Sequence, residues 1–138
     1  MRTEPDSRRK PTILVIMPDY KQDYRVLKQI LPESQYSFVK ADSPRQAEKY
    51  ITRKAFRVDV VICETNLPEG DWRDVLRVTQ DNPYKPKLVL CSRHADDQLW
   101  AEALNVGAYD VLIKPFWPEE VSRVIQLATF PVQTMRAH

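Results

Sequence analysis

Side chains that could recognise a phosphoryl group follow three short apolar runs of the chain. Glu64 follows the run 58–63, Ser92 follows 87–91, and Lys114 follows 109–113. A carboxylate can accept a group or pair with a cation, a hydroxyl can bond phosphate oxygens, and an ammonium neutralises their charge. If the runs are neighbouring parallel strands, these three side chains meet in one site.

Apolar runs alternate with amphipathic segments along the chain. Runs rich in Val, Ile and Leu predict strands buried on both faces, and apolar residues at helical spacing predict helices between them. The predicted strands are 12–17, 36–41, 58–63, 87–91 and 109–113, and the predicted helices are 20–31, 43–55, 71–80, 96–106 and 118–128. This alternation predicts an α/β fold with a doubly wound parallel sheet. Ligand sites in such sheets lie at the carboxyl ends of the strands.

The length of 138 residues fits one domain with short tails. We expect a basic flexible tail over 1–11, one domain over 12–128 and a second tail over 129–138. Gly70 and Gly107 are the two glycines of the sequence, and this scarcity excludes the glycine-rich loops of nucleotide-binding enzymes. We therefore do not expect an enzyme.

The formal net charge of +2 is carried by residues 1–11, and the rest of the sequence holds equal numbers of basic and acidic residues. A neutral body argues against a nucleic-acid partner, although the basic tail leaves such binding open. No apolar run has the length of a membrane span. Cys63 and Cys91 lack the spacing of a disulfide scaffold or zinc site. We expect both to be small buried core residues on one face of neighbouring strands. These features predict a reduced, cytoplasmic protein.

Three segments of the sequence resemble the receiver domain of two-component response regulators, a resemblance that covers residues 12–128. They are 59–71 (DVVICETNLPEGD), 89–92 (VLCS) and 103–116 (ALNVGAYDVLIKPF), the last ending in the Lys-Pro pair of that family. The resemblance implies a flavodoxin-like (βα)5 sheet with strand order 2-1-3-4-5. It also implies a mechanism in which an aspartate accepts a phosphoryl group from a histidine kinase, acids hold magnesium, and an aromatic residue acts as a switch.

The sequence departs from this pattern at the site. Met17 and Pro18 offer no oxygen ligand from their side chains, so we expect no cofactor and weak Mg²⁺ binding at best. The matched positions are the phosphoacceptor (Glu64), the acid pair (Met17 and Pro18, with Asp19 one residue later), the switch (Val111) and the phosphate-binding group (Ser92, Lys114 and Pro115, with a cis peptide bond before Pro115).

Glu64 allows two interpretations. Its side chain is one methylene longer than the aspartate of the family, which moves the carboxylate outward toward Lys114 and Ser92. It is either a built-in mimic of the phosphorylated state or a plain ion pair with Lys114. Both predict an atypical receiver that ordinary phosphorylation does not switch, acting as a protein-interaction module in bacterial signal transduction. The alternatives are a working phosphorelay receiver that uses Asp19 with a non-standard acceptor, and a small enzyme on a flavodoxin-like sheet.

Apolar and aromatic residues mark a candidate interaction surface on the fourth helix, fifth strand and fifth helix. They are Trp100, Leu104, Tyr109 and Trp117. Tryptophan and tyrosine are enriched in binding hot spots, so we expect a protein partner here. The resemblance implies a histidine kinase as a partner and leaves a homodimer open. The competing interpretation is that Trp100 and Trp117 pack against each other or against the rim of the core.

Overall fold

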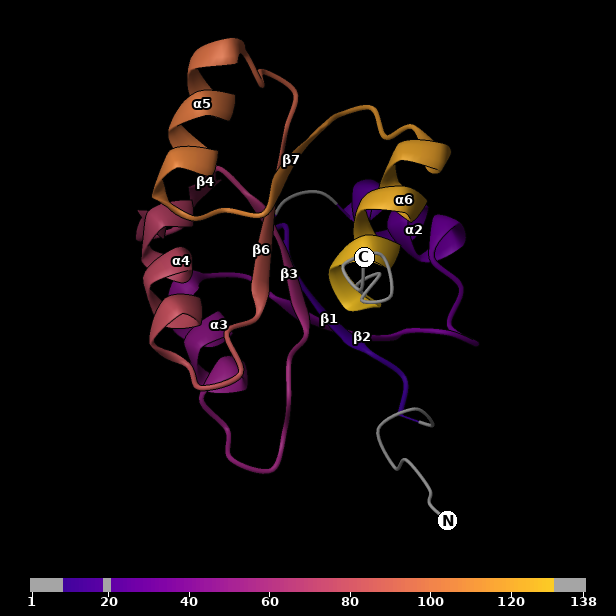
Figure 1. The fold of residues 1–138 in the computed structure, drawn as a ribbon, viewed down its shortest axis with the longest axis vertical. Helices are drawn as coiled ribbons and strands as arrows, with labels where there is room; N and C mark the ends of the chain where they lie inside the picture. Colours follow the sequence, from indigo (N-terminus) through magenta and orange to yellow (C-terminus); the bar gives the residue numbers. More distant parts are fainter. Residues whose placement is uncertain (1–8, 19–20, 131–138) are drawn as a thin grey trace, which may run out of the picture.

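An open five-stranded parallel sheet forms the centre of the computed structural model, which describes residues 9–18 and 21–130 (Figure 1). Its strands lie in the order β2-β1-β3-β6-β7, and this confirms the predicted order 2-1-3-4-5. Parallel neighbours need a crossover between them, and a helix supplies each one. The strands are β1 (Thr12–Ile16), β2 (Ser37–Ala41), β3 (Val60–Glu64), β6 (Lys87–Ser92) and β7 (Asp110–Ile113).

Helices cover both faces of the sheet (Figure 1). One face carries α2 (Lys21–Ile30) and α6 (Pro118–Thr129). The other face carries α3 (Pro44–Ile51), α4 (Trp72–Asp81) and α5 (Asp97–Val106). Every residue of β1 and β3 is buried, because both faces of these central strands are covered. Continuous apolar runs, rather than alternating ones, are the sequence pattern of such strands.

Strand alternation divides the core into two apolar clusters. Leu14 and Ile16 point toward α3 and α4, whereas Ile13 and Val15 point toward α2 and α6. Burying one side chain of this size stabilises the fold by about 1.5–3 kcal/mol. The two clusters meet across β1 and β3, so the strand ends that carry Glu64 and Met17 are fixed by packing on both sides.

Several sequence expectations fail at the ends of elements. The helix predicted over 43–55 ends at Ile51, and Ala55, within the predicted range, is exposed beyond it. Val106, the last residue of the helix predicted over 96–106, is 44% exposed in the last turn of α5. Within the expected tail 1–11, Arg9 is paired with Asp59 and Pro11 is buried. Residues 1–8 and 131–138 lie outside the described part of the chain.

The loop predicted after Glu64 contains a short antiparallel hairpin, β4 (Asn66–Leu67) with β5 (Gly70–Asp71). Its turn places Glu69 at a φ of 64°, so Glu69 and not Gly70 takes the left-handed conformation. A Cβ at Gly70 would lie 2.4 Å from Asp74 Oδ2, so a larger residue there would push the Asp74 carboxylate away from its hydrogen bond with Asp71 N. The hairpin thereby delivers the chain directly into the first turn of α4.

A reciprocal cap begins α4. Asp71 accepts a hydrogen bond from Arg73 N at 2.9 Å, and Asp71 N donates to Asp74 Oδ2 at 3.0 Å. This pair satisfies backbone donors that a helix leaves without a partner. The hydrogen bond from Asp71 N also lowers the pKa of the Asp74 carboxyl.

We expect Asp71→Ala to reduce the free energy of unfolding by about 1 kcal/mol, the typical cost of losing such a cap. For a domain of this size, that loss lowers the midpoint of thermal unfolding by about 3–6 °C. The matched control is Asp81→Ala at the last residue of α4, where a negative charge gains nothing from the helix dipole. Equal midpoints for both variants, measured by circular dichroism, would contradict the capping role.

Candidate functional site

The carboxyl ends of four strands bring together the side chains that the sequence singled out. Met17 follows β1, Glu64 ends β3, Ser92 ends β6, and Lys114 follows β7. All four are buried, with exposed fractions between 0% for Met17 and 6% for Glu64 and Ser92. The register explains their meeting, because Glu64 lies opposite Cys91 and Ser92 lies opposite Ile113. The residues nevertheless differ in what they contact.

Lys114 is the centre of the site. Its ammonium donates hydrogen bonds to Glu64 Oε2 and, at 3.1 Å, to Asp23 Oδ2. The Lys114 side chain is 1% exposed, so water does not compete for this cation. A buried ammonium without a partner is costly, and two carboxylates remove that cost. We call the set Glu64, Lys114 and Asp23 the carboxylate clamp.

Sequence reasoning missed Asp23. It lies in the first turn of α2, and the amino terminus of that helix opens onto the same sheet edge as Glu64. An acidic residue in the first turn of a helix that follows a strand of this sheet is the signal that could have found it. Our prediction considered only the residues directly after each strand.

The expected acid pair belongs to the core instead. Met17 is fully buried in the apolar cluster that includes Leu27, Cys91 and Leu112. Pro18 follows it without a side-chain oxygen, and Asp19 lies outside the described residues. Within 9–18 and 21–130, no group of three or more metal-ligating side chains is placed to hold an ion. Because the carboxylates of Glu64 and Asp23 already bind Lys114, these residues do not fit a magnesium centre.

Ser92 and the bond before Pro115 close the site from β6 and β7. Ser92 Oγ accepts a hydrogen bond from His94 N at 3.0 Å, while Ser92 O accepts one from Lys114 N at 3.0 Å. The Lys114–Pro115 peptide bond is cis, which confirms the expectation from the sequence. His94 itself is exposed in the turn after β6.

The two cysteines lie on opposite faces of the sheet, which corrects the expectation that they share one. Cys63 belongs to the α3–α5 side, and Cys91 belongs to the α2–α6 side. The reason is register: Glu64, and not Cys63, lies opposite Cys91, so the cysteines are offset by one residue. Burial raises the pKa of both thiols well above the ordinary range. Because the two thiols point to opposite faces of the sheet, they cannot form a disulfide with each other.

The expected interaction surface is only partly assembled. Trp100 in α5 and Trp117 before α6 are 49% and 70% exposed, and Leu104 is half-buried. Tyr109 lies at the opposite end of β7, where the Lys87 ammonium sits 6.0 Å from its ring centroid. The ring contacts found in the described residues pair Tyr24 with Phe38 and Tyr50 with Phe56, so the two tryptophans do not stack. Val111, at the switch position, is buried in the core.

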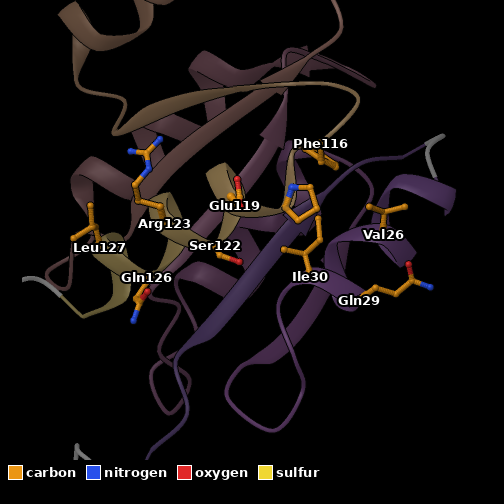
Figure 2. A pocket seen from close by; sticks show the side chains of 10 residues that line it. Val26, Gln29, Ile30, Phe116, Glu119, Ser122, Arg123, Gln126 and Leu127 are labelled. Atoms are coloured by element: carbon orange, nitrogen blue, oxygen red, sulfur yellow. The ribbon is translucent and has the colours of Figure 1, made fainter.

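A groove of about 850 Å³ separates α2 from α6 (Figure 2). The sequence did not indicate it. Its apolar lining comes from Val26, Ile30, Phe116 and Leu127, and polar side chains of α6 such as Glu119 and Arg123 form its rim. The groove is wide and open to solvent, which is typical of a surface depression between two helices rather than of an enclosed ligand site.

Among the described residues, no helix has both the length and the apolar character required to cross a bilayer.

Known proteins share this chain's sequence pattern and fold. The chemotaxis protein CheY of Thermotoga maritima is 30% identical over 98 residues, covering 70% of this chain and 79% of CheY. The regulatory protein AtoC of Escherichia coli strain K12 is 31% identical over 78 residues, covering 56% of this chain but 17% of AtoC. The chain therefore spans a small part of that relative.

Solved structures agree with these relatives. The signal receiver domain of an HD domain-containing protein from Pseudomonas fluorescens Pf-5 superposes with a TM-score of 0.73 at 29% identity, covering 87% of this chain and 94% of that one. A two-component response regulator from Clostridium difficile gives a TM-score of 0.73 at 26% identity, covering 93% of this chain and 100% of that one.

The sequence profile of the response regulator receiver domain matches residues 14–126, most of the chain. Glu64, Ser92 and Lys114 lie within the matched residues, and so do the five strands of the sheet except the first two residues of β1. This chain belongs to the response regulator receiver domain family, the signalling modules of two-component systems.

Proposed function

We propose that this chain is a receiver domain whose phosphorylation site has been replaced by a permanent ion-pair cluster, and that it signals as a protein-interaction module in bacteria without phosphotransfer. The observation that carries the proposal is the carboxylate clamp: the Lys114 ammonium is buried and already bound by Glu64 and Asp23.

The charge of the clamp supports this proposal. Two carboxylates face one ammonium, so no positive charge is left over for an incoming phosphoryl group, which carries about −1.5 to −2. The geometry of Glu64 adds to the effect, since its carboxylate accepts a hydrogen bond from Lys114 and is not directed toward a phosphoryl donor. Met17, at a position where the family has an acid, packs in the core and cannot supply a hard oxygen ligand.

The position of Val111 supports a domain with one fixed output surface. A buried valine has one strongly restricted side-chain torsion and cannot swing between an inward and an outward position as a large ring would. The exposed indoles of Trp100 and Trp117 support a protein partner on the α5–β7–α6 side. A histidine kinase remains a candidate partner for docking, and sedimentation velocity at several concentrations will decide whether a second copy of the chain binds instead.

The clamp should be a strongly coupled structural unit. We expect Lys114→Met to reduce the free energy of unfolding by about 3 kcal/mol, because it leaves the buried Glu64 carboxylate and the partly exposed Asp23 carboxylate without this cation. Glu64→Gln should cost less, since the ammonium keeps Asp23. The double variant should regain part of the loss, which urea denaturation followed by the fluorescence of buried Trp72 will measure.

The control for this cycle is Lys49→Met, an exposed lysine of α3. Its free energy of unfolding should stay within about 0.5 kcal/mol of that of the unaltered chain. Additive effects of Glu64→Gln and Lys114→Met would show that the two groups are independent, and would remove the basis of the proposed clamp.

We expect no phosphorylation of the chain by acetyl phosphate with Mg²⁺. Intact-mass measurement should show no stable increase of about 80 Da, the mass of one phosphoryl group. An increase that disappears in Glu64→Ala would refute the proposal. Met17→Asp/Pro18→Asp/Glu64→Asp is the comparison variant, since it restores carboxylates of the family's type at the three altered positions.

Magnesium titration separates the proposal from a working phosphorelay receiver that uses Asp19. We expect the fluorescence of Trp72 and Trp117 to stay constant up to millimolar Mg²⁺, because the described carboxylates of the site are bound to Lys114. Saturable quenching at sub-millimolar Mg²⁺ would favour the phosphorelay alternative. Calcium at the same ionic strength controls for general salt effects.

A further inference from the structure

The amino-terminal edge of the sheet concentrates positive charge. Three segments of the described chain lie at this edge: the segment entering β1, the α3–β3 connection and the α4–β6 connection (Figure 1, lower part). Each of them carries basic residues. We call this group the basic edge. Its members are Arg9, Lys10, Arg53, Lys54, Arg57, Lys85 and Lys87.

Backbone and side-chain hydrogen bonds hold these segments together. Asn82 Nδ2 donates to Ile51 O at 2.9 Å and so ties the end of α4 to the end of α3. Asp59 N donates to Thr12 O at 2.9 Å, and Lys87 N donates to Asp59 O at 3.1 Å. The basic side chains are therefore carried by connections that the fold fixes next to one another.

Acidic residues do not cancel this charge. Asp59 is the acid nearest the centre of the edge, and its carboxylate is shared by Arg9, at 2.9 Å, and Arg57, at 3.3 Å. The Asp59 carboxylate is therefore already bound by two guanidinium groups and is not left to pair with the lysines of the edge. Glu33 is paired with Lys28, and Asp81 is exposed at the end of α4, so the basic side chains of the edge outnumber these three acids. The neutral sum over the body conceals this separation of charge.

Aromatic rings orient two of the arginines. The Arg57 guanidinium lies 4.8 Å from the Tyr84 ring centroid, and Tyr84 is 57% exposed. Arg53 lies 5.5 Å from the Tyr50 ring and 5.9 Å from the Phe56 ring. Stacked guanidinium groups keep their edges available to oxygen acceptors. Arginines beside an exposed ring are the combination on which unpaired bases stack.

A small cleft lies within the edge. Its volume is about 120 Å³, and its lining includes Arg57, Asp59, Tyr84, Lys85 and Lys87. This is the room of about four water molecules, enough for the oxygens of a phosphate group and too small for a nucleobase. A ligand that fits would place a phosphate in the cleft and a base outside it, beside the Tyr84 ring.

We propose that the basic edge binds single-stranded nucleic acid through its phosphodiester backbone. Its cations lie across the starts of β1, β3 and β6, which are neighbouring strands about 4.8 Å apart. A row of charges suits a flexible polymer that repeats a negative charge along its length. The exposed Tyr84 ring adds a stacking partner that duplex DNA or a lipid headgroup would not use.

Fluorescence anisotropy of a labelled twelve-nucleotide oligothymidylate with the full chain tests the proposal. With about four phosphate contacts, affinity should fall about 50-fold between 50 and 200 mM salt. Lys54→Gln/Arg57→Gln/Lys87→Gln should weaken binding at least about tenfold at 50 mM salt and flatten the salt dependence. Tyr84→Ala should weaken it by about tenfold through lost stacking.

Matched variants separate this site from total charge and from misfolding. Arg25→Gln/Arg45→Gln/Arg123→Gln removes the same charge from exposed positions elsewhere and should change affinity less than threefold. Lys54→Gln/Lys87→Gln keeps the Arg57–Asp59 pair and should still weaken binding, with an unchanged thermal midpoint.

Four outcomes would overturn the proposal. They are no salt-sensitive binding of the oligonucleotide, equal loss in both triple variants, binding that depends only on residues 1–8, and tighter binding to duplex DNA or to phosphatidylserine vesicles than to the single strand. A phosphorylatable chain would refute the proposed function without affecting this result, because Glu64 and Lys114 lie at the opposite end of the strands.

Discussion

A single buried cation organises the carboxyl end of this sheet. Lys114 belongs to the turn after β7, Glu64 to the end of β3 and Asp23 to the first turn of α2, so one ammonium joins three elements that are distant in sequence. Removing water from a charge is expensive, and the fold has to bring both carboxylates to it. This requirement constrains the neighbouring structure. The position of α2 and the ends of the central strands, with Met17 buried beside them, must bring Glu64 and Asp23 to the Lys114 ammonium.

Much of the fold could be predicted from the sequence, because continuous apolar runs such as 12–17 and 58–63 are specific to strands covered on both faces. The strand order came from the family resemblance, and the structure confirms it. What failed was local. Ala55 continued a helical pattern that ends at Ile51, and the hairpin of β4 and β5 is too short to leave a periodic signal. The offset of Cys63 and Cys91 depends on strand register, which the residue types do not specify.

The site was predictable to the extent that it follows strands. Glu64, Ser92 and Lys114 could be placed at one edge because parallel strands end together. Asp23 could not, since it reaches the edge from a helix and only the three-dimensional path of α2 brings it to Lys114. The basic edge was hidden for a related reason: summing charges over residues 12–138 gives a neutral body, and a sum carries no information about where charges lie. Family membership explains the fold that positions both ends of the sheet, while the residues at each end decide its chemistry.

The carboxylate clamp also bears on how such a domain can evolve. Shortening Glu64 to aspartate alone would draw its carboxylate away from the buried ammonium, and restoring an acid at Met17 alone would add a charge to an apolar cluster. Each single step back toward a phosphate-accepting pocket therefore passes through a less stable protein. For the receiver domain that we propose, selection for stability would therefore oppose reversal, because a pocket filled by its own side chains could return to phosphate binding only through several simultaneous substitutions.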